Sequence, residues 1–516
     1  MASQSLLELV VQRFLYGLKN FPFPFADFLL VWVFVLIPRM IFFANYDTRL
    51  SDIPFVNNRK WYEIGYFKAK SRFLANAATL IKSGFDQGDV FRMVMDNGVI
   101  MVLHPKFANQ IRTIEGLSFS ESLAEDFHAQ IPGFDPFTSE KLIHDVIKTK
   151  LKHVVKPLSE ETLMALEEWP IGFDDGREFP LRKNVLELVA RLTSKTLLGS
   201  EIGRNPAWHK IMVNYTVDAF VAAYILRLFP KFLRPLVSKF IPQCRKLRNE
   251  LAEARRIIDP VLGSREKERV PIGELPNAVV EDGFVWLEQC ANGRVYDPVI
   301  AQLSLSVVAI HTTSDMLTQV LFDIAERPEL ISALRKEIIQ VFDNDRVYLT
   351  RGNLQQLKLM DSVLKESQRL KPVNIVSMRR RANYNIRLSD GTLIPKGTMI
   401  CVSNHWMWDS VIYRNPEKFD AFRFYKKSGI MSYDFASKFV SPSPEHLGFG
   451  LGRHVCPGRF FAATEIKIIL CHILLRYKIQ LAPASKPEIM KVGAALGANL
   501  DANVLLKRRW QEVVLR

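Results

Sequence analysis

Cys456 is the residue in this sequence most suited to chemistry, and it stands in the run 449–458 (FGLGRHVCPG). A cysteine binds a metal as its thiolate, which requires a lowered thiol pKa. A helix that begins at Pro457 would lower it in part, because proline suits the first helical position and the positive helix end would point at the sulfur. The glycines let the backbone turn sharply and approach a flat macrocycle, and Phe449 can shield the sulfur. The alternative is a buried structural thiol.

Thr312 and Thr313 form a second candidate group, inside a long stretch of helical periodicity at residues 298–327, and His311 directly precedes them. A threonine hydroxyl can hydrogen-bond an oxygen ligand and relay protons. Taken alone, Thr312 would be an ordinary helix residue whose hydroxyl bonds its own backbone. A catalytic role for Thr312 therefore depends on the chemistry at Cys456.

Glu366 and Arg369 are spaced to share one face of a helix expected at residues 360–370. Arg423 follows in the run 419–424 (FDAFRF). A solvated surface pair is the usual explanation for such spacing. A buried charged cluster is the alternative, and it stabilises a fold only when fully paired, because removing one partner strands a buried charge.

The run 449–458 resembles the cysteine-ligand loop of the cytochrome P-450 superfamily, written FxxGxRxCxG. Its fixed positions are occupied by Phe449, Gly452, Cys456 and Gly458. The resemblance implies haem b as cofactor, with Cys456 as the axial ligand of its iron. The sequence departs from the pattern at His454, where the family has an arginine that meets a haem propionate. Histidine can still donate a hydrogen bond at that position.

The run 308–313 (VAIHTT) resembles the oxygen-binding helix of the same family, usually AGxET or AGxDT. Thr312 matches its threonine, and Thr313 is the usual second hydroxyl. Ala309 replaces the glycine and His311 replaces the acidic residue. The departure at His311 bears on how protons are delivered, and we expect His311 to assist Thr312.

Glu366, Arg369 and Arg423 resemble the ExxR and PERF-type elements of the family, which form a buried charged triad beneath the haem. Arg369 precedes Cys456 by 456 − 369 = 87 residues, and Arg423 lies between them. The resemblance implies a structural role for the triad, not a catalytic one.

Two further places resemble the propionate-binding positions of the family. His144 and Lys148 stand where the family carries WxxxR, and they would share a helix face. A solvated face is the alternative for this pair. In the run 379–381 (RRR), one arginine would meet the other propionate, and we expect Arg380 from its spacing to residues 390–391.

Hydrophobic periodicity predicts a mainly α-helical fold with small β-sheets at one side. A hairpin is expected at Asp96-Asn97-Gly98, because Asn-Gly stands between two apolar runs, and another near residues 389–391. Helices are expected at residues 185–198, 213–227, 298–327, 328–342 and 360–370. With no linker or repeat in view, the resemblance implies one cytochrome P-450 catalytic domain at residues 45–516, with haem between the Thr312 helix and the Cys456 loop.

The N-terminal region reads as a transmembrane helix at residues 25–44, behind a short segment at residues 1–24. Its apolar stretch approaches the roughly 20 residues needed to cross a bilayer. Lys and Arg cluster after it, so the catalytic domain should face the cytoplasm from the endoplasmic reticulum. A buried core helix is the alternative. The apolar, basic run 220–242 is either two core helices with their loop or a membrane-dipping lid for an oily substrate.

Composition excludes several classes of protein. The chain is 48% hydrophobic and 24% charged, which is ordinary for a globular protein. Five scattered cysteines without CxxC spacing argue against a disulfide framework. The net charge of +15 comes without a zinc-finger or RNA-binding signature. We therefore expect a membrane surface and an acidic redox partner, and no nucleic acid.

The family resemblance implies a haem-thiolate monooxygenase that acts on an apolar small molecule with O₂. Electrons would come from a separate NADPH-dependent reductase, because no Gly-rich dinucleotide fingerprint or fused flavin domain is visible. The run GRHVCPGRFFA resembles fungal members that oxidise terpenoids, such as ent-kaurene-oxidase-like enzymes. The alternatives are a reductase-independent haem-thiolate isomerase or dehydratase, and a haem-binding protein without catalysis.

Overall fold

The computed structural model describes residues 52–63, 65–138, 140–151, 154–173, 176–267, 282–342, 346–427 and 434–515. The expected segment at residues 1–24 and the expected anchor at residues 25–44 lie outside the described residues. Within the described ranges, none of the helices combines the length and the apolar character that a bilayer span requires.

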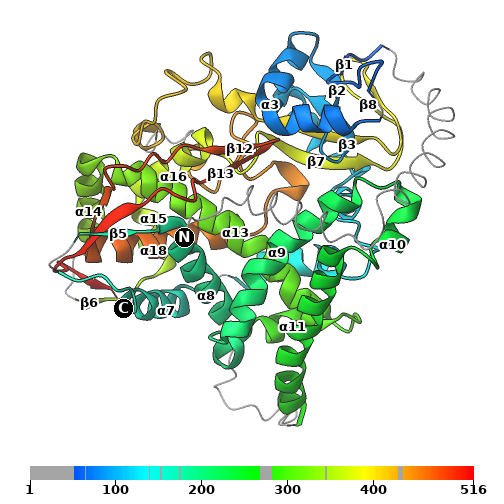
Figure 1. The fold of residues 1–516 in the computed structure, drawn as a ribbon. Helices are drawn as coiled ribbons and strands as arrows, with labels where there is room; N and C mark the ends of the chain where they lie inside the picture. The colour runs from blue at the N-terminus through cyan, green and yellow to red at the C-terminus, as the bar shows by residue number, and fades with distance from the viewer. Residues whose placement is uncertain are drawn as a thin grey trace.

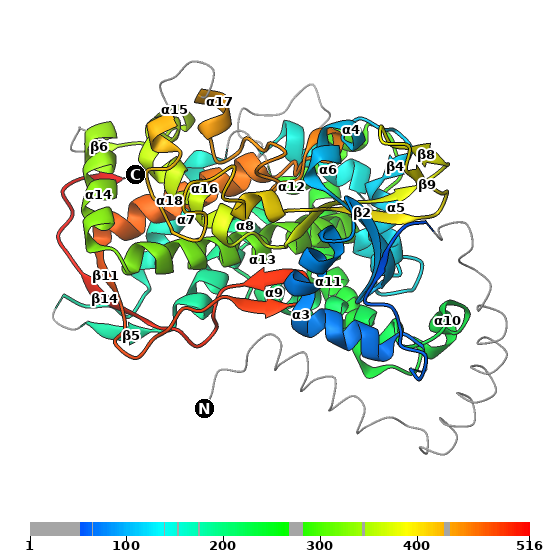
Figure 2. The ribbon, with the colours of Figure 1, turned by 90° about the horizontal axis from the view of Figure 1, so that it is seen from above.

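Helices make up most of the described chain, and they gather around one long central helix, α13 (Pro298–Ala325) (Figures 1 and 2). The other longer helices are α3 (Phe67–Phe85), α5 (Phe119–Asp126), α6 (Glu140–Thr149), α7 (Val155–Glu167), α8 (Leu181–Ile202), α9 (Pro206–Leu226), α11 (Pro242–Lys267), α12 (Gly283–Ala291), α14 (Pro328–Val341), α16 (Lys358–Leu370) and α18 (Arg459–Arg476). The short ones are α4 (Ala108–Ile111), α10 (Arg234–Val237), α15 (Arg351–Gln356) and α17 (Asp434–Ser437). Helices α8, α9, α14, α16 and α18 all contact α13.

The strands lie mainly to one side of the helices, as Figure 1 shows for the largest sheet. That sheet has six strands in the order β1-β2-β3-β10-β7-β4. They are β1 (Phe55–Val56), β2 (Val90–Met95), β3 (Gly98–Leu103), β4 (Leu117–Ser118), β7 (Val376–Ala382) and β10 (Met399–Ser403). The small sheets use β5 (Arg177–Phe179), β6 (Arg346–Val347), β8 (Ile386–Arg387), β9 (Leu393–Ile394), β11 (Tyr477–Leu481), β12 (Met490–Val492), β13 (Ala495–Gly497), β14 (Val504–Arg508) and β15 (Val514–Leu515). The predicted mainly helical fold with small sheets is confirmed.

Both hairpins predicted from turn residues are present. Strands β2 and β3 pair antiparallel from Val90 opposite Leu103 to Met95 opposite Gly98. Gly98 has φ +126°, in the region that favours glycine, so the Asn-Gly signal had a physical basis. The second hairpin joins β8 to β9 around Gly391, which has φ +89°.

The two helices that carry the candidate residues begin with clear local signals. Asp297 caps α13 because its Oδ1 accepts the N–H groups of Val299 and Ile300, at 3.0 and 3.1 Å, and Pro298 takes the first position. Helix α18 begins at Arg459, two residues later than the start expected at Pro457. Pro457 and Gly458 form a turn between Cys456 and the helix, so its amide-rich end still lies next to the cysteine.

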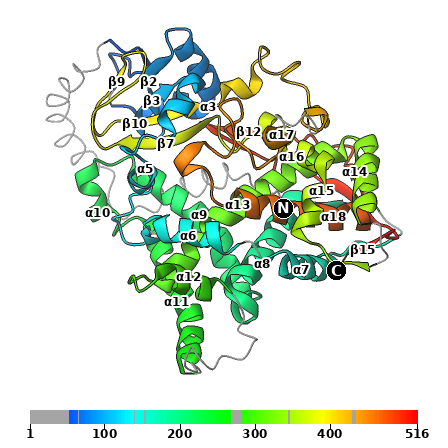
Figure 3. The ribbon, with the colours of Figure 1, turned by 180° about the vertical axis from the view of Figure 1, so that it is seen from behind.

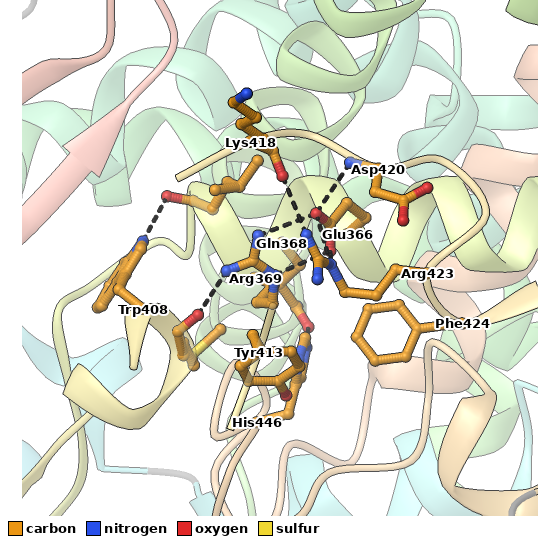
Figure 4. Close-up of polar contacts among 12 residues, drawn as sticks. Glu366, Gln368, Arg369, Trp408, Tyr413, Lys418, Asp420, Arg423, Phe424 and His446 are labelled. Carbon is orange, nitrogen blue, oxygen red and sulfur yellow. Dashed lines mark hydrogen bonds and ion pairs between the residues drawn. The ribbon is translucent and has the colours of Figure 1, made fainter. Parts of the chain in front are cut away.

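Helix α16 is tied to the chain that precedes the Cys456 loop by one buried carboxylate, that of Glu366 (Figure 4). Arg369 Nε and Nη2 donate to its two oxygens at 2.8 and 2.9 Å. Arg423 Nε donates to both oxygens, at 3.0 and 2.9 Å, and the N–H of Asp420 adds a bond of 3.1 Å. Five hydrogen-bond contacts thus converge on one carboxylate, which balances the cost of burying its charge.

Other side chains of α16 hold the segment that leads to Cys456. Lys365 Nζ donates to the carbonyls of Ala436, Lys438 and Ser441 at 2.8, 2.9 and 2.8 Å. Gln368 Oε1 lies 3.0 Å from His446 Nε2. A Cβ at Gly448 would come within 2.4 Å of the Gln368 side chain, so a larger residue there would displace Gln368. The loop that ends in the cysteine is therefore shaped against α16.

We expect Glu366→Gln to lower the free energy of unfolding by about 3–5 kcal/mol, because it leaves two guanidinium groups around a neutral amide. Thermal and chemical denaturation would measure the loss. Glu160→Gln is the control, since Glu160 forms an exposed pair with Lys156 at 3.9 Å, and it should stay close to the wild type. Equal stability of Glu366→Gln and wild type would contradict the importance of the cluster.

Glu465 is a buried acid on α18 with few partners. One oxygen accepts from Thr193 Oγ1 at 3.3 Å, and the other has no hydrogen-bond partner among the described residues. Burial raises the pKa of Glu465 to about 8, against a small lowering by Thr193. At neutral pH this side chain is therefore held mostly in its protonated form.

Glu465 should make stability depend on pH. The unfolded chain releases this proton near about pH 4.3 and the folded chain only near 8, so its contribution falls as pH rises between these values. Glu465→Gln should remove that decline and be more stable than the wild type above about pH 8, by a few kcal/mol at order of magnitude. Unfolding midpoints from about pH 5 to 9 would measure this. The exposed Glu417→Gln is the control, and an unchanged slope in Glu465→Gln would contradict the assignment.

Candidate active site

The Cys456 loop is built from glycines in conformations that other residues rarely adopt. Gly450 and Gly452 have φ of +70° and +76°. A Cβ at Gly452 would lie 2.3 Å from the Cβ of Arg112, so the close approach of the two backbones also requires glycine. The N–H of Cys456 donates to the carbonyl of Phe449 at 2.9 Å, which closes the loop. These contacts hold the sulfur in one place.

The thiol of Cys456 receives hydrogen bonds that the other buried thiols lack. Burial raises its pKa, while the N–H groups of Gly458 and Arg459 and the charge of Arg459 lower it. By contrast, burial raises the pKa of Cys401 to about 12, with only distant charges acting on it. Amide donors aimed at sulfur are what a ligating thiolate needs.

Phe449 lies beside this loop, half-buried, with its ring edge-on to Phe439 at 5.0 Å between centroids. It packs with the hydrophobic core and not in solvent. This position is consistent with a ring that limits the access of water to the loop.

Helix α13 is buried along most of its length but has one exposed face, formed by Val308, Thr312 and the half-buried Ala309. Val308 is 52% exposed, whereas residues 301–306, which precede it on the helix, are all buried. We call these three residues the open face of α13. Thr312 Oγ1 donates to the carbonyl of Val308 at 3.2 Å, the local bond expected of a helical threonine.

The other two residues of the predicted catalytic group point elsewhere. Thr313 is buried on another face of α13. His311 Nε2 lies 3.1 Å from the carbonyl of Val213 on α9, which leaves that nitrogen committed to a neighbouring helix. Burial, followed by the charge of Arg182, lowers the pKa of His311 to about 4, so the imidazole is neutral at pH 7. His311 and Thr312 thus have different surroundings in the structure, and their joint role in proton delivery stays a prediction.

Three of the residues expected to bind the haem propionates, His454, Arg380 and His144, lie close to one another. His454 has its pKa lowered to about 4 by burial and then by Arg380, Arg453 and His144, which places those charges nearby. The rings of Phe119 and His454 are 6.2 Å apart, and the guanidinium of Arg380 lies 5.5 Å from the ring of Phe119. Phe119 was missed by sequence reasoning, because a lone phenylalanine far along the chain carries no signal.

The alternation of strand β7 separates the three consecutive arginines. Arg379 pairs with Asp126 at 3.2 Å, and Arg381 lies 3.8 Å from Glu121 and 3.7 Å from Glu125, all on α5. Arg380 is buried on the opposite face of the strand. The structure therefore distinguishes Arg380 from its two neighbours.

His144 and Lys148 line a cavity of about 500 Å³ between α6, the start of α18 and the Cys456 loop. Figure 3 shows α6 beside α12 on the side of α13 that faces the viewer there. Arg351, Arg453 and Arg459 also line the cavity, so it is strongly basic. Of these, Arg459 follows directly on the cysteine motif and could have been found from sequence, whereas Arg351 could not.

The comparisons with known proteins agree with this geometry. Residues 299–500 match the family model described as "Cytochrome P450". The chain is 42% identical over 482 residues to "Cytochrome P450 monooxygenase adrA" of Penicillium rubens, covering 90% of this chain and 93% of that protein. It is 40% identical to "Cytochrome P450 monooxygenase trt6" of Aspergillus terreus, covering 94% and 97% of the two chains.

A solved structure shares the fold. The protein described as "Retinoic acid bound cyanobacterial CYP120A1" superposes with a TM-score of 0.66 over 89% of this chain and 99% of that one. The sequence identity is 17%, so this likeness concerns the fold alone.

Haem b is the prosthetic group of this family, and the residues present fit it. Cys456 offers a half-buried sulfur with two amide donors, next to a glycine that leaves its surface uncovered: a Cβ at Gly458 would lie 4.0 Å from Sγ. Basic groups suited to the propionates, Arg380 and His454 among them, lie together near the loop. On the similarity over nine-tenths of its length and on this donor set, the chain belongs to the cytochrome P-450 family.

Proposed function

We propose that the chain hydroxylates, or oxidises further, an apolar terpenoid of fungal secondary metabolism. The chain is a cytochrome P-450 monooxygenase, so the overall reaction is R–H + O₂ + 2e⁻ + 2H⁺ giving R–OH + H₂O. The observation that carries the proposal is that two backbone N–H groups donate hydrogen bonds to the Cys456 sulfur. The open face of α13, at Val308, Ala309 and Thr312, offers a surface for an apolar substrate. The terpenoid class rests on the resemblance of the run GRHVCPGRFFA to fungal terpenoid oxidases.

Haem b, when bound, supplies the iron at which dioxygen is reduced. Cys456 would hold that iron through its sulfur, and the N–H groups of Gly458 and Arg459 would stabilise the negative charge on the thiolate. Gly450 and Gly452, with their positive φ, would let the loop backbone approach the haem closely. Phe449 would restrict water around the sulfur.

Thr312 would hold and move a proton. Its hydroxyl stands on the open face of α13, and a rotation about χ1 would free it from the carbonyl of Val308. A positioned donor of this kind contributes about 10²–10⁴-fold to a proton-transfer step. His311 would act through position, by tying α13 to α9 at Val213. Thr313, buried on another face, would support the helix.

The propionates would be held by His454, Arg380, His144 and Lys148. Arg380 supports this assignment because it is buried on the face of β7 opposite its acid-paired neighbours. Glu366, Arg369 and Arg423 would serve structurally, by holding the loop that presents Cys456.

A separate NADPH-dependent reductase would dock at the basic cavity beside the Cys456 loop. Arg351, Arg453 and Arg459 line it, and the net charge of the chain is +15. A basic surface steers an acidic partner and makes its association depend on salt. Docking there would bring electrons to the side of the protein that carries the axial cysteine.

The membrane proposal has three parts: a short segment at residues 1–24, a single transmembrane anchor at residues 25–44, and the catalytic domain at residues 45–516 facing the cytoplasm from the endoplasmic reticulum. It is supported by an exposed apolar patch that we define as Trp61, Phe67, Phe232, Leu236 and Phe240. Burial lowers the pKa of Lys70 on α3, and the nearby charges of Arg227 and Arg234 lower it further, which brings α3 close to the segment that carries Arg234. In Figure 2, α3 and α10 lie at the same edge of the molecule.

The sequence alone left two other functions open: a haem-thiolate isomerase or dehydratase that needs no reductase, and a haem-binding protein without catalysis. Only the monooxygenase consumes NADPH, through its reductase, in step with an oxygenated product. Microsomes that contain the chain and a reductase, given NADPH and a terpene scaffold, would distinguish the three by product analysis.

Thr312→Ala should keep the carbon-monoxide difference band of haem-thiolate but lower product formed per NADPH consumed, by about tenfold or more, because the proton donor is lost. Oxygen should then leave as hydrogen peroxide. Thr312→Ser, which retains the hydroxyl, should restore most of the coupling. Wild-type coupling in Thr312→Ala would remove Thr312 from the proton path and favour the isomerase hypothesis.

Deletion of residues 1–44 should weaken attachment to membranes without loss of the carbon-monoxide band. In that truncated protein, the double substitution Phe232→Glu and Leu236→Glu should release most of the protein that still sediments with membranes. Both side chains are apolar and more than half exposed. Val411→Glu, at an exposed position elsewhere, is the control. The fraction that sediments with membranes is the measurement, and a truncated protein without haem would show that the N-terminal run belongs to the core.

A further inference from the structure

Asp315 is a nearly buried carboxylate on α13 for which the proposed chemistry has no use. One of its oxygens, Oδ1, accepts the N–H of Ala498 at 2.8 Å. The other, Oδ2, accepts from Gln319 Nε2 at 2.6 Å. Arg182 Nη2, from the first turn of α8, lies 3.6 Å from Oδ1 and provides the opposite charge. Three groups from separate positions in the chain thus meet at the Asp315 side chain.

Arg182 is itself buried and is shared between two residues of α13. Its Nη1 donates to Ser314 Oγ at 3.2 Å, next to the contact with Asp315. Burial lowers the pKa of Arg182, and the carboxylate of Asp315 opposes that effect. Arg182 and Asp315 therefore compensate each other's burial, and removing either one leaves a buried charge without its partner. We call Arg182, Asp315, Gln319 and the N–H of Ala498 the clamp.

The clamp holds the end of a small hairpin, β12 and β13, which pair from Met490 opposite Gly497 to Val492 opposite Ala495. The rest of this hairpin is attached elsewhere. Ile375 donates its N–H to the carbonyl of Ala494, and Leu496 donates to the carbonyl of Val373, at 2.8 and 3.0 Å. At the turn, Gly493 donates to the carbonyl of Leu74 on α3 at 2.8 Å. In Figure 1 the hairpin lies between α3 and α13.

These attachments place the hairpin beside the candidate active site. Residues 373–375 lead directly into β7, where Ser377 Oγ donates to the carbonyl of Leu447 in the segment that leads to the cysteine, at 3.1 Å. On the other side, Asp315 stands less than one helical turn after Thr312 on α13. The hairpin therefore spans from the strand beside the Cys456 loop to the helix that carries the open face.

The exposed residues of the β12–β13 hairpin are consistent with a hairpin that forms one wall of the substrate-binding site. Ala495 and Asn374 are bridged to each other and are both exposed, although the strand that follows Asn374 is buried at alternate positions. Small side chains at residues 493–495 (GAA) leave room next to this surface. A wall made of backbone and alanine has little packing of its own, so its position depends on where its ends are attached.

We propose that Asp315 is a positioning residue that sets the distance between this hairpin wall and the open face of α13, and thereby selects among substrates by size and shape. The inference rests on the proposed function in that the wall must border the space where substrate lies near the haem. Loss of the bond to Ala498 would free one end of the hairpin. A shift the size of one methylene is enough to change binding of a bulky ligand by about tenfold.

The chain offers a matched control on the same helix. Asp323 is as buried as Asp315, with side chains 10% and 11% exposed, and each pairs with a cation that is 12% exposed. Asp323 binds Lys371 and Ser367, both at 2.7 Å, and neither contact involves the hairpin. Asp315→Leu and Asp323→Leu therefore remove equivalent buried charges, but only the first releases the hairpin.

The test uses imidazole and 4-phenylimidazole, which share one iron-binding ring and differ by a phenyl group, titrated into the full haem-loaded chain by visible spectroscopy. Asp315→Leu should change the ratio of the two dissociation constants by about tenfold or more, while imidazole alone binds as in the wild type. Asp315→Asn should keep the wild-type ratio, because its amide oxygen can still accept from Ala498. Asp323→Leu should keep it as well.

This test of the role of Asp315 does not depend on the terpenoid assignment, because both ligands bind the haem iron whatever the natural substrate is. An unchanged ratio in Asp315→Leu, or an equal change in Asp323→Leu, would overturn the proposal. If Asp315→Leu fails to bind haem, Ala498→Pro replaces it, because proline removes the N–H and leaves Arg182 paired. A changed ratio in Ala498→Pro would support the proposal, and a wild-type ratio would overturn it. Failure of both to bind haem while Asp323→Leu binds it would also overturn it, since the clamp would then serve folding alone.

Discussion

One buried carboxylate, that of Glu366, carries the arrangement on which the active site depends. It accepts from Arg369 on its own helix and from Arg423 on the loop that follows, so it joins two parts of the chain that would otherwise repel each other. The remaining guanidinium protons go to backbone carbonyls, including that of Met407 at 2.6 Å. Because the two guanidinium groups share one carboxylate and also donate to backbone carbonyls, the cluster is well hydrogen-bonded, and this gives α16 one geometry. The loop that presents Cys456 is then shaped against that helix.

The central helix α13 serves the core and the reaction at once. Most of its faces are buried, and this rigidity gives Thr312 a defined position on the open face. The same helix sends polar side chains outward to its neighbours: His311 to α9, Asp315 to the β12–β13 hairpin and Asp323 to Lys371. These hydrogen bonds and ion pairs are directional, so they fix the position of each neighbour relative to α13 more closely than apolar burial alone would.

Charge is divided in this protein according to burial. Inside, cations meet carboxylates or carbonyl groups, as Lys365 does with three carbonyls, and the cost of burial is balanced. The cavity beside the Cys456 loop is lined by several cations, among them the exposed Arg351 and Arg453, of which Arg453 also pairs with the exposed Glu115 at 3.2 Å. The first arrangement stabilises the fold, and the second suits an acidic redox partner. Burial, and not the type of residue, separates the two roles.

The sequence by itself determined the features that depend on neighbours along the chain: the Cys456 loop, the Asn-Gly hairpin at residues 96–98, the span of α13, and the i, i+3 pairing of Glu366 with Arg369. Local backbone preferences and helical spacing are enough for these. Only the tertiary structure decided which way His311 turns, which of three consecutive arginines is buried, and that Asp315 binds Ala498. Those outcomes depend on side-chain directions and on contacts between segments far apart in the chain, and such contacts leave no periodicity or spacing in the sequence of a single chain.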